Sequence, residues 1–236
     1  QAVTCDDFAQ AIADANPGSE LSQRLEAFKR WYSQAGTPHV RATGRHDAQA
    51  RSYTLTLTQS CAATPGQPVK APFVIPVELG LLAQDGSALP LQLDGESTAG
   101  ATTRTVVLAD SSLQLTFVNV NSAPVPSLLR GFSAPVVLDH DYSDADLLTL
   151  LAHDSDAFNR WEAGQRLSLG RLLAALPGDA DLPPLDEAYL QALRRVLRDD
   201  SLDPAFKDQV LQLPSEAYVA EIVGSEVNPQ RIHRLR

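Results

Sequence analysis

The sequence has no methionine, few aromatic residues and only two cysteines among its 236 residues. A natural initiating residue is therefore missing, and we expect the chain to be processed or to be a piece of a longer protein. Lys and Arg number 19 against 29 Asp and Glu, so no basic surplus exists to neutralise nucleic-acid phosphates or an anionic membrane surface. We therefore expect no nucleic acid and no membrane among its partners.

Long apolar segments are lacking too. The longest apolar runs, such as 147–152, fall far short of the roughly 20 residues that a membrane-spanning helix needs. The chain does not open with a basic segment followed by an apolar core, so no signal peptide is predicted. Cys5 and Cys61 are too few for a disulfide framework or a structural zinc site, and we expect free thiols in a reducing compartment. A reactive Cys5 at a helix N-terminus is the alternative, although no basic residue adjoins it.

The first 37 residues have a helical period. Apolar residues recur at spacings of three and four over 4–16, where Thr4 and Asp7 form a capping-box pattern. A second helix is predicted over 21–34, with Trp31 beside its apolar stripe. Core packing is the favoured role of this tryptophan, because large aromatic side chains supply burial first.

From residue 38 to 142 the period changes from 3.6 to 2. Apolar residues alternate with polar ones around Leu55, Val77 and Leu115, and turn signals such as Asp85-Gly86 follow at short intervals. This spacing predicts an antiparallel β-sandwich of about seven strands. Pro76 lies inside one predicted strand and indicates an edge or a bulge there, because proline cannot donate to the ladder.

From residue 143 to 236 the pattern is helical again. Ser143 and Asp146 form a capping pair. The longest predicted helix contains Gly164, which costs about 1 kcal/mol against alanine and which close helix packing could offset. Most of the acidic excess lies in this zone and indicates a solvated outer face. Helices joined by short loops, as in an α-solenoid or bundle, are predicted over 158–176, 185–198, 204–213 and 215–223.

The sequence contains no complete catalytic motif. The five histidines include neither H-E-x-x-H nor a pair at i, i+4 that could share a metal. The acidic segment 139–146 lacks the turn glycine and the closing glutamate of a calcium loop, so a capped helix start is favoured. Residues 131–135 lack the last glycine of a nucleophile elbow and precede a strand. We therefore predict no catalytic, cofactor-binding or metal-binding residue in this chain.

Four segments in order along the chain resemble the bacterial aminopeptidase N family of zinc exopeptidases, which belongs to the gluzincin class. They extend over nearly the whole sequence and are more specific than any short motif. The segments are Thr4-Cys5-Asp6-Asp7-Phe8, residues 29–38 (KRWYSQAGTP), residues 124–136 (PVPSLLRGFSAPV) and residues 154–167 (DSDAFNRWEAGQRL).

The resemblance implies an internal fragment of a four-part enzyme. Residues 1–37 would be the C-terminal helices of the catalytic domain, residues 38–142 its β-sandwich domain, and residues 143–236 the start of a C-terminal helical domain. In the family, H-E-x-x-H and a downstream glutamate bind zinc, and the glutamate of that motif acts as general base. None of these motifs occurs here. The resemblance thus implies zinc in the parent enzyme and none bound by this chain.

The leading hypothesis is a non-catalytic spacer and lid base within a peptidase that removes N-terminal amino acids from peptides. Its partners would be the remaining domains of the same polypeptide, with peptide substrates for the parent. Residues 1–37 would either mediate self-association or fold back on the sandwich with Trp31 as the anchor. The resemblance also implies a cytoplasmic location, as is typical of the family in bacteria. The alternative is a free-standing β-sandwich and helical module that docks a partner protein. A third reading, a hydrolase using His140 and Asp141, lacks a nucleophile and an oriented base.

Overall fold

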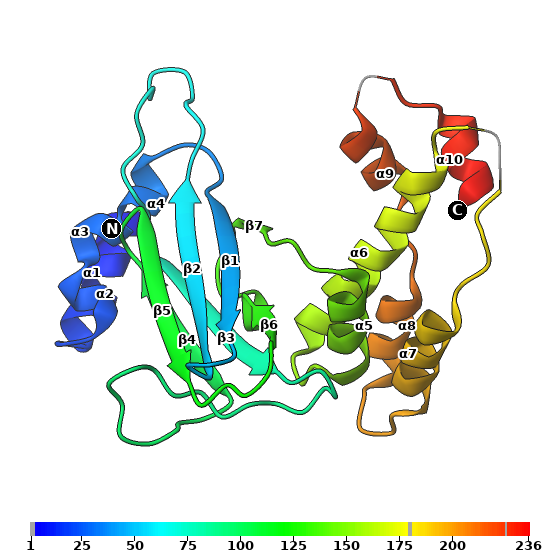
Figure 1. Ribbon diagram of the computed structural model, residues 1–236. Coiled ribbons are helices and arrows are strands. Elements are labelled where there is room, and N and C mark those ends of the chain that lie inside the picture. Colours follow the sequence, from blue (N-terminus) through cyan, green and yellow to red (C-terminus); the bar gives the residue numbers. More distant parts are fainter. Residues whose placement is uncertain (1–2, 179–180, 225) are drawn as a thin grey trace. The chain divides into compact units, whose positions relative to one another are not determined.

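The computed structural model describes residues 3–178, 181–224 and 226–236. Its order is a group of short helices, then seven strands among the described residues, then further helices (Figure 1). The chain divides into two compact units. The first holds the chain up to residue 80 together with Pro90–Pro124 and Phe132–Asp141, and the second holds Leu81–Leu89, Val125–Gly131 and Tyr142–Arg236.

The predicted N-terminal capping box is confirmed at the start of helix α1 (Cys5–Ala15). The Thr4 hydroxyl accepts a hydrogen bond from the Asp7 amide at 3.2 Å, and the Asp7 carboxylate accepts one from the Thr4 amide at 3.0 Å. These two bonds satisfy donors that the first helical turn leaves open. Behind the cap, Ala9 and Ala13 pack on Leu25.

The prediction of one helix over 21–34 is wrong. The segment forms α2 (Glu20–Gln23), α3 (Leu25–Phe28) and α4 (Arg30–Ser33). Arg24, between α2 and α3, has φ −122° and ψ 19°, outside helical values. The apolar stripe therefore continues, but over three short helices in place of one.

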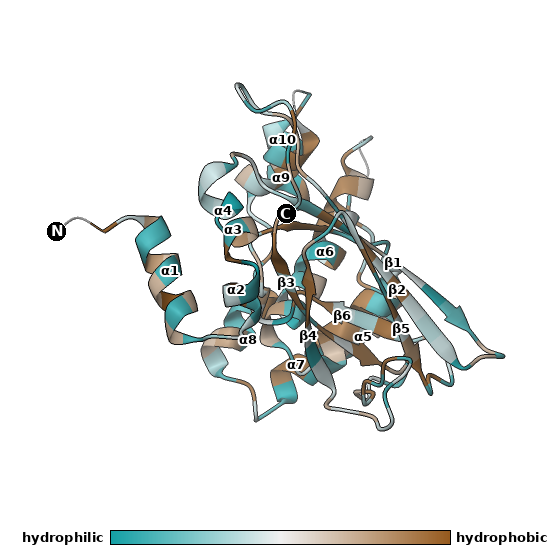
Figure 2. Cartoon of the chain, turned by 90° about the vertical axis from the view of Figure 1, so that its left-hand side faces the viewer, coloured by the Kyte–Doolittle hydropathy of each residue, from teal (hydrophilic) through white to brown (hydrophobic). Residues whose placement is uncertain are grey.

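The predicted sandwich of seven strands is confirmed. One sheet has the order β5-β2-β1-β7 and the other has the order β4-β3-β6. In Figure 2 the ribbon of β3 is largely brown, the colour of apolar residues. The strands are β1 (His39–Asp47), β2 (Ser52–Ser60), β3 (Ile75–Leu82), β4 (Thr103–Leu108), β5 (Ser112–Val118), β6 (Val125–Leu128) and β7 (Val137–Asp139).

Strand pairing in the first unit is antiparallel with one exception. The pairs β1–β2, β2–β5 and β3–β4 are antiparallel, whereas the three residues of β7 run parallel to β1. The register sets Leu55 opposite Leu115, so the alternating apolar residues of neighbouring strands face the same side. Leu55, Leu57, Val77 and Phe117 are at most 1% exposed. The period-2 pattern thus becomes the buried face of this unit.

The prediction that Pro76 marks an edge or a bulge is wrong, because β3 is the middle strand of its sheet. The N–H groups of alternate strand residues point the same way. Two residues beyond the proline, the Glu78 amide donates to the Ser133 hydroxyl at 3.0 Å. The donor that Pro76 lacks would point to this same side, where a side chain takes the place of a ladder partner.

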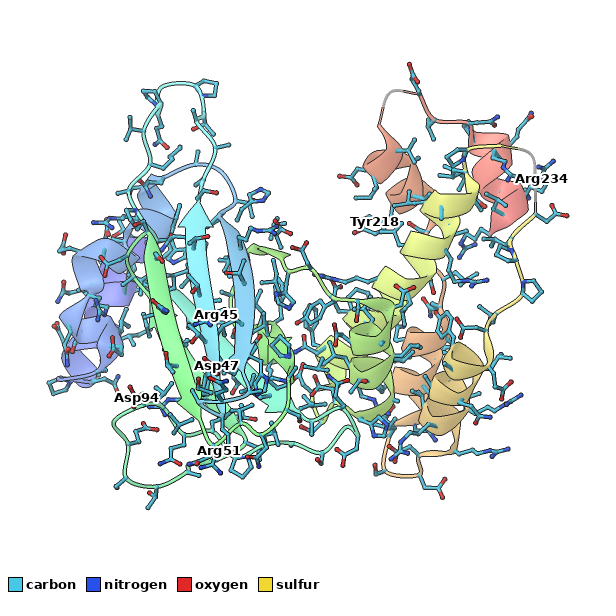
Figure 3. All side chains as sticks on the ribbon, in the orientation of Figure 1. Arg45, Asp47, Arg51, Asp94, Tyr218 and Arg234 are labelled. Atoms are coloured by element: carbon cyan, nitrogen blue, oxygen red, sulfur yellow. The ribbon has the colours of Figure 1, made fainter. Side chains whose placement is uncertain are left out.

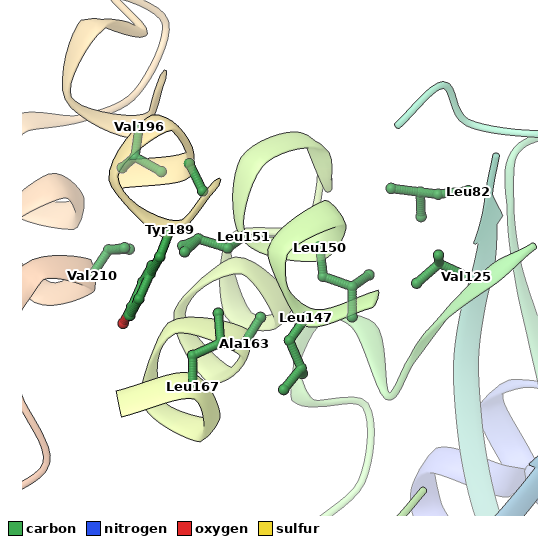
Figure 4. Close-up of a cluster of buried hydrophobic side chains, with 11 residues drawn as sticks. Leu82, Val125, Leu147, Leu150, Leu151, Ala163, Leu167, Tyr189, Val196 and Val210 are labelled. Atoms are coloured by element: carbon green, nitrogen blue, oxygen red, sulfur yellow. The ribbon is translucent and has the colours of Figure 1, made fainter. Parts of the chain in front are cut away.

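The second unit is built on helices, as the sequence predicts for residues after 143. α5, α6, α7 and α8 share one apolar cluster with Leu82 and Val125, drawn in Figure 4. A smaller cluster joins α6, α9 and α10 through Leu172, Val219 and Ile232. The helices are α5 (Asp144–His153), α6 (Ala157–Ala175), α7 (Glu187–Arg198), α8 (Pro204–Leu211), α9 (Glu216–Val223) and α10 (Pro229–Leu235).

Two predicted features of this unit concern the helices α5 and α6. The Ser143–Asp146 capping box is present, and α6 is the longest described helix. At Gly164, a methyl group would lie 3.6 Å from both the Leu151 side chain and the Val210 carbonyl oxygen. Neighbours therefore approach α6 closely there, at ordinary van der Waals distance. Helix α10 was not predicted, although its Asn228 cap and Pro229 at the first turn are helix-start signals.

Candidate functional site

The most deeply buried ion pair of the described residues joins the 3₁₀ turn η1 (Arg130–Phe132) to the connection between α5 and α6. Arg130 Nη2 lies 3.2 Å from Asp154 Oδ1, and the two side chains are 5% and 0% exposed. Arg130 also donates to the Ser155 hydroxyl. Burial raises the pKa of the Asp154 carboxyl, while a hydrogen bond from the Asp156 amide and the charge of Arg130 oppose that rise.

Three further hydrogen bonds extend this buried cluster. The Gly131 amide donates to Asp156 Oδ2 at 2.8 Å, and Asp156 Oδ1 accepts from the Asn159 amide at 2.9 Å as the N-cap of α6. The buried Asn159 side chain donates to the Ser127 hydroxyl at 2.7 Å. Each of these polar groups is engaged by a neighbour in the same unit. The cluster therefore joins β6 and η1 to the start of α6, and it contains no nucleophile with an oriented base.

The acidic segment 139–146 contacts β1 with its first residues and caps α5 with its last. Asp139 and Asp141 both pair with Arg41, and His140 Nδ1 lies 2.9 Å from the Ala42 carbonyl oxygen. Asp146 caps α5. The predicted strand end followed by a capped helix is thus confirmed. Asp139 and Asp141 share Arg41 as their partner, and Asp146 bonds Ser143.

The remaining residues that the sequence singles out are in the elbow-like segment 131–135, the two cysteines and the second tryptophan. The Ser133 hydroxyl accepts the Glu78 amide hydrogen bond, so the elbow-like segment 131–135 supports a strand. Cys5 and Cys61 are free thiols, the first exposed and the second partly buried. Trp161 packs against the apolar cluster of the helical unit.

Trp31 anchors the N-terminal helices on the sandwich, which agrees with the predicted packing role. Its ring centroid lies 4.8 Å from that of Phe73, and its indole N–H donates to the Val74 carbonyl oxygen at 2.8 Å. On the same stretch, the Gln34 side chain accepts from the Ala71 amide at 2.7 Å and donates to the Ala71 carbonyl oxygen at 2.9 Å. These contacts tie α4 and its C-terminal flank to residues 71–74.

The described residues do not fit a zinc site. Across 3–178, 181–224 and 226–236, no group of three or more His, Cys, Asp or Glu side chains lies close enough together to hold a metal ion. Zinc in proteins takes three or four such ligands. In the same residues, no helix combines the length and apolar character that crossing a membrane requires.

Comparisons with known proteins decide the relationship. Residues 36–141 match the family described as a domain of unknown function (DUF3458) with an Ig-like fold, and residues 144–236 match its partner (DUF3458_C) with ARM repeats. The chain is 38% identical over 225 residues to aminopeptidase N of Escherichia coli and 41% identical over 236 residues to that of Caulobacter vibrioides. The chain is homologous to bacterial aminopeptidase N. These alignments cover 94% and 100% of the chain but about a quarter of each relative.

A solved structure supports the same fold. The crystal structure of Legionella pneumophila aminopeptidase A in complex with aspartic acid matches 98% of this chain and 24% of its own, with a TM-score of 0.77 and 24% identity. The homology to aminopeptidase N that four segments of the sequence predict is confirmed by the identities of 38% and 41% to the two relatives above.

The segments that resemble aminopeptidase N contain the anchoring contacts described above. Arg130 lies in the segment 124–136, and its partners Asp154 and Ser155 lie in the segment 154–167. Trp31 lies in the segment 29–38. In this aminopeptidase N homologue, the recognisable motifs thus supply contacts between elements of one unit.

Proposed function

We propose that this chain is a non-catalytic part of a zinc-dependent aminopeptidase that removes N-terminal amino acids from peptides. The observation that carries the proposal is homology to aminopeptidase N over 94–100% of the chain and only about a quarter of those relatives. The sequence also lacks the H-E-x-x-H pattern that such chemistry uses. The zinc and the catalytic groups belong, in this proposal, to other parts of the same polypeptide.

The finer role we propose is that of spacer and lid base. A sandwich with a continuous buried face resists deformation, because packed interiors are dense and poorly compressible. The Arg130–Asp154 ion pair holds the connection between α5 and α6 against η1, and the Trp31 hydrogen bond holds α4 against Val74. We place the domain boundaries near residues 37 and 142, and the remaining domains of the polypeptide are the expected partners.

The chain alone provides the first test. Purified by itself, it is expected to bind no stoichiometric zinc and to leave aminoacyl-anilide substrates intact. Metal analysis and an anilide assay, each with and without chelator, measure both. One tightly held zinc per chain together with chelator-sensitive turnover would contradict the proposal.

The spacer role requires the longer protein, identified by a coding region in which these residues follow H-E-x-x-H. There, Arg130→Leu with Asp154→Leu replaces the buried pair by apolar residues, which often leaves stability unchanged. We expect an unchanged zinc content and a lower kcat/KM for peptides. The matched surface pair, Arg41→Gln with Asp139→Asn, is expected to leave both unchanged.

The alternative of a free-standing interaction module is less well supported, because the homology extends over the whole chain. A coding region with a start and a stop directly flanking these residues would revive it. Unchanged peptidase kinetics in the Arg130→Leu/Asp154→Leu variant of a folded longer protein would count against the spacer role alone.

A further inference from the structure

A groove of about 550 Å³ runs between α5 and α7 in the helical unit. Three small apolar side chains line it, Ala152 on α5 and Ala188 and Ala192 on α7, beside the polar Thr149 and Gln191. Leu148 adds a larger apolar surface. A ligand with apolar groups can therefore bury them there.

One end of the groove is basic. Arg194, Arg195 and Arg198 from the last turns of α7 line it together with His153 from the end of α5. This grouping contrasts with the composition of its surroundings, since residues 143–236 contain 16 Asp and Glu against 10 Lys and Arg.

Three acidic side chains near this end of the groove are already engaged. Glu187 pairs with Arg194 at 2.9 Å, and Asp199 pairs with Arg160 and accepts from Ser201. Asp85 accepts hydrogen bonds from Ser87. Among the described residues, the side chains of Arg195 and Arg198 form no hydrogen bond or ion pair.

The local potential at this end of the groove is positive. Burial lowers the pKa of His153, and the charges of Arg195 and Arg160 lower it further, against an opposing effect of Asp85. Burial lowers the pKa of Arg160, and the charge of Arg195 lowers it further, against the opposing hydrogen bond and charge of Asp199. Cations that repel one another in this way favour an anion between them.

We propose that this groove binds an acidic peptide segment whose apolar side chains contact Leu148 and the alanines and whose carboxylates pair with Arg195 and Arg198. Guanidinium groups suit carboxylates because their planar donors match both oxygens. Compensation of the α7 dipole accounts for basic residues in its last turn. It does not account for a groove with apolar side chains beside two arginines that have no carboxylate partner in the described part of the chain.

The test uses the full chain and a fluorescent peptide of alternating leucine and glutamate, with the leucine–glutamine peptide as its uncharged match. Fluorescence anisotropy measures both dissociation constants. We expect binding of the acidic peptide only, weakened by Arg195→Gln with Arg198→Gln by about fivefold or more, as two exposed ion pairs imply. Binding is also expected to weaken as salt concentration rises.

The charge-matched control is Arg24→Gln with Arg45→Gln, which removes two positive charges from the other unit and is expected to leave the affinity unchanged. Circular dichroism confirms that each variant is folded. Equal weakening in the control, equal binding of the glutamine peptide or no binding of the acidic peptide would each overturn the proposal. Binding of inorganic phosphate without binding of the acidic peptide would also overturn it, in favour of a simple anion site.

Discussion

The side-chain amide of Gln59 forms a reciprocal pair with the backbone of Phe73: its nitrogen donates to the Phe73 carbonyl oxygen at 2.9 Å, and its oxygen accepts from the Phe73 amide at 2.7 Å. The same nitrogen lies 3.3 Å from the Leu108 carbonyl oxygen and 2.9 Å from that of Asp110. Gln59 belongs to β2 in one sheet, whereas Leu108 belongs to β4 in the other. One polar side chain thus joins both layers of the sandwich.

Replacing Gln59 by alanine is expected to lower the free energy of unfolding by about 2–4 kcal/mol, because several hydrogen bonds are lost at once. Urea denaturation measures the difference. The control is Gln10→Ala, since the Gln10 side chain donates to the exposed Asp14 on a helix surface. That change is expected to stay within about 0.5 kcal/mol of the wild type. Equal losses in the two variants would contradict the role of Gln59.

Breaking the buried Arg130–Asp154 ion pair is expected to lower the free energy of unfolding more than breaking an exposed pair. Asp154→Ala leaves the Arg130 guanidinium buried without its carboxylate, and such losses typically reach about 3–5 kcal/mol. Asp139→Ala removes a partner from an exposed pair with Arg41 and is expected to cost a small fraction of that. Urea denaturation of both variants tests the difference, and similar midpoints for the two would contradict it.

Two glycines are expected to respond in opposite directions to alanine. Gly86 has φ +85°, and a methyl group there would lie 2.1 Å from the His153 ring, so Gly86→Ala is expected to destabilise by about 1–3 kcal/mol. Gly164 lies in helix α6 with room at 3.6 Å, so Gly164→Ala is expected to stabilise by up to about 1 kcal/mol. Thermal denaturation compares the two. A loss of stability at Gly164 would show that its neighbours cannot accommodate the methyl group.

The stability that the β1–β2 turn contributes is expected to depend on pH in the acid range. Arg45, Asp47 and Arg51 lie at this end of the hairpin (Figure 3), and the Asp47 carboxylate accepts from the Ala50 and Gln49 amides. The hydrogen bond from Ala50, above all, holds the pKa of Asp47 below its ordinary value of 3.8. A carboxyl group whose pKa is lower in the folded than in the unfolded protein stabilises the fold at pH values above the unfolded pKa. This stabilisation is lost as the pH falls through the folded pKa.

Asp47→Ala is therefore expected to be less stable than the wild type at neutral pH, with a difference that shrinks below about pH 3.8. Urea midpoints measured across this range test the expectation. Asp94→Ala, at an exposed loop residue, is the control. A difference that grows toward acid pH would contradict the sign.

Periodicity predicts the parts of this fold whose burial follows one regular pattern. Leu55 and Leu57 alternate with polar residues, and Thr4 and Ser143 precede capped helices, so both classes of element are evident in the sequence. Strand β6 is not evident in the sequence, because all four of its residues are buried and Pro126 interrupts it. Strand β1 is not evident either, since one of its buried positions is the small Ala42, which weakens the apolar alternation.

Contacts between distant segments explain the other differences. The apolar stripe over 21–34 predicts one helix, but Trp31 and Gln34 bind residues 71–74, and such tertiary contacts override local propensity. The candidate groove was missed because its residues come from two helices separated by α6. A signal was present in Arg194, Arg195 and Arg198, which adjoin two alanines on α7 in an otherwise acidic segment.

The last prediction concerns self-association through residues 1–37. Phe8 is 61% exposed, Ile12 39% and Tyr32 47%, although α4 is anchored by Trp31. Exposed apolar groups of this kind favour association, because each large side chain contributes about 1.5–3 kcal/mol when fully buried. We expect light scattering to show a mass that rises with concentration, and Phe8→Ser with Ile12→Ser to suppress that rise. Val69→Ser, at an exposed apolar residue outside these helices, is the control. A chain that stays monomeric at all concentrations would contradict the prediction and would mean that these side chains tolerate exposure to water.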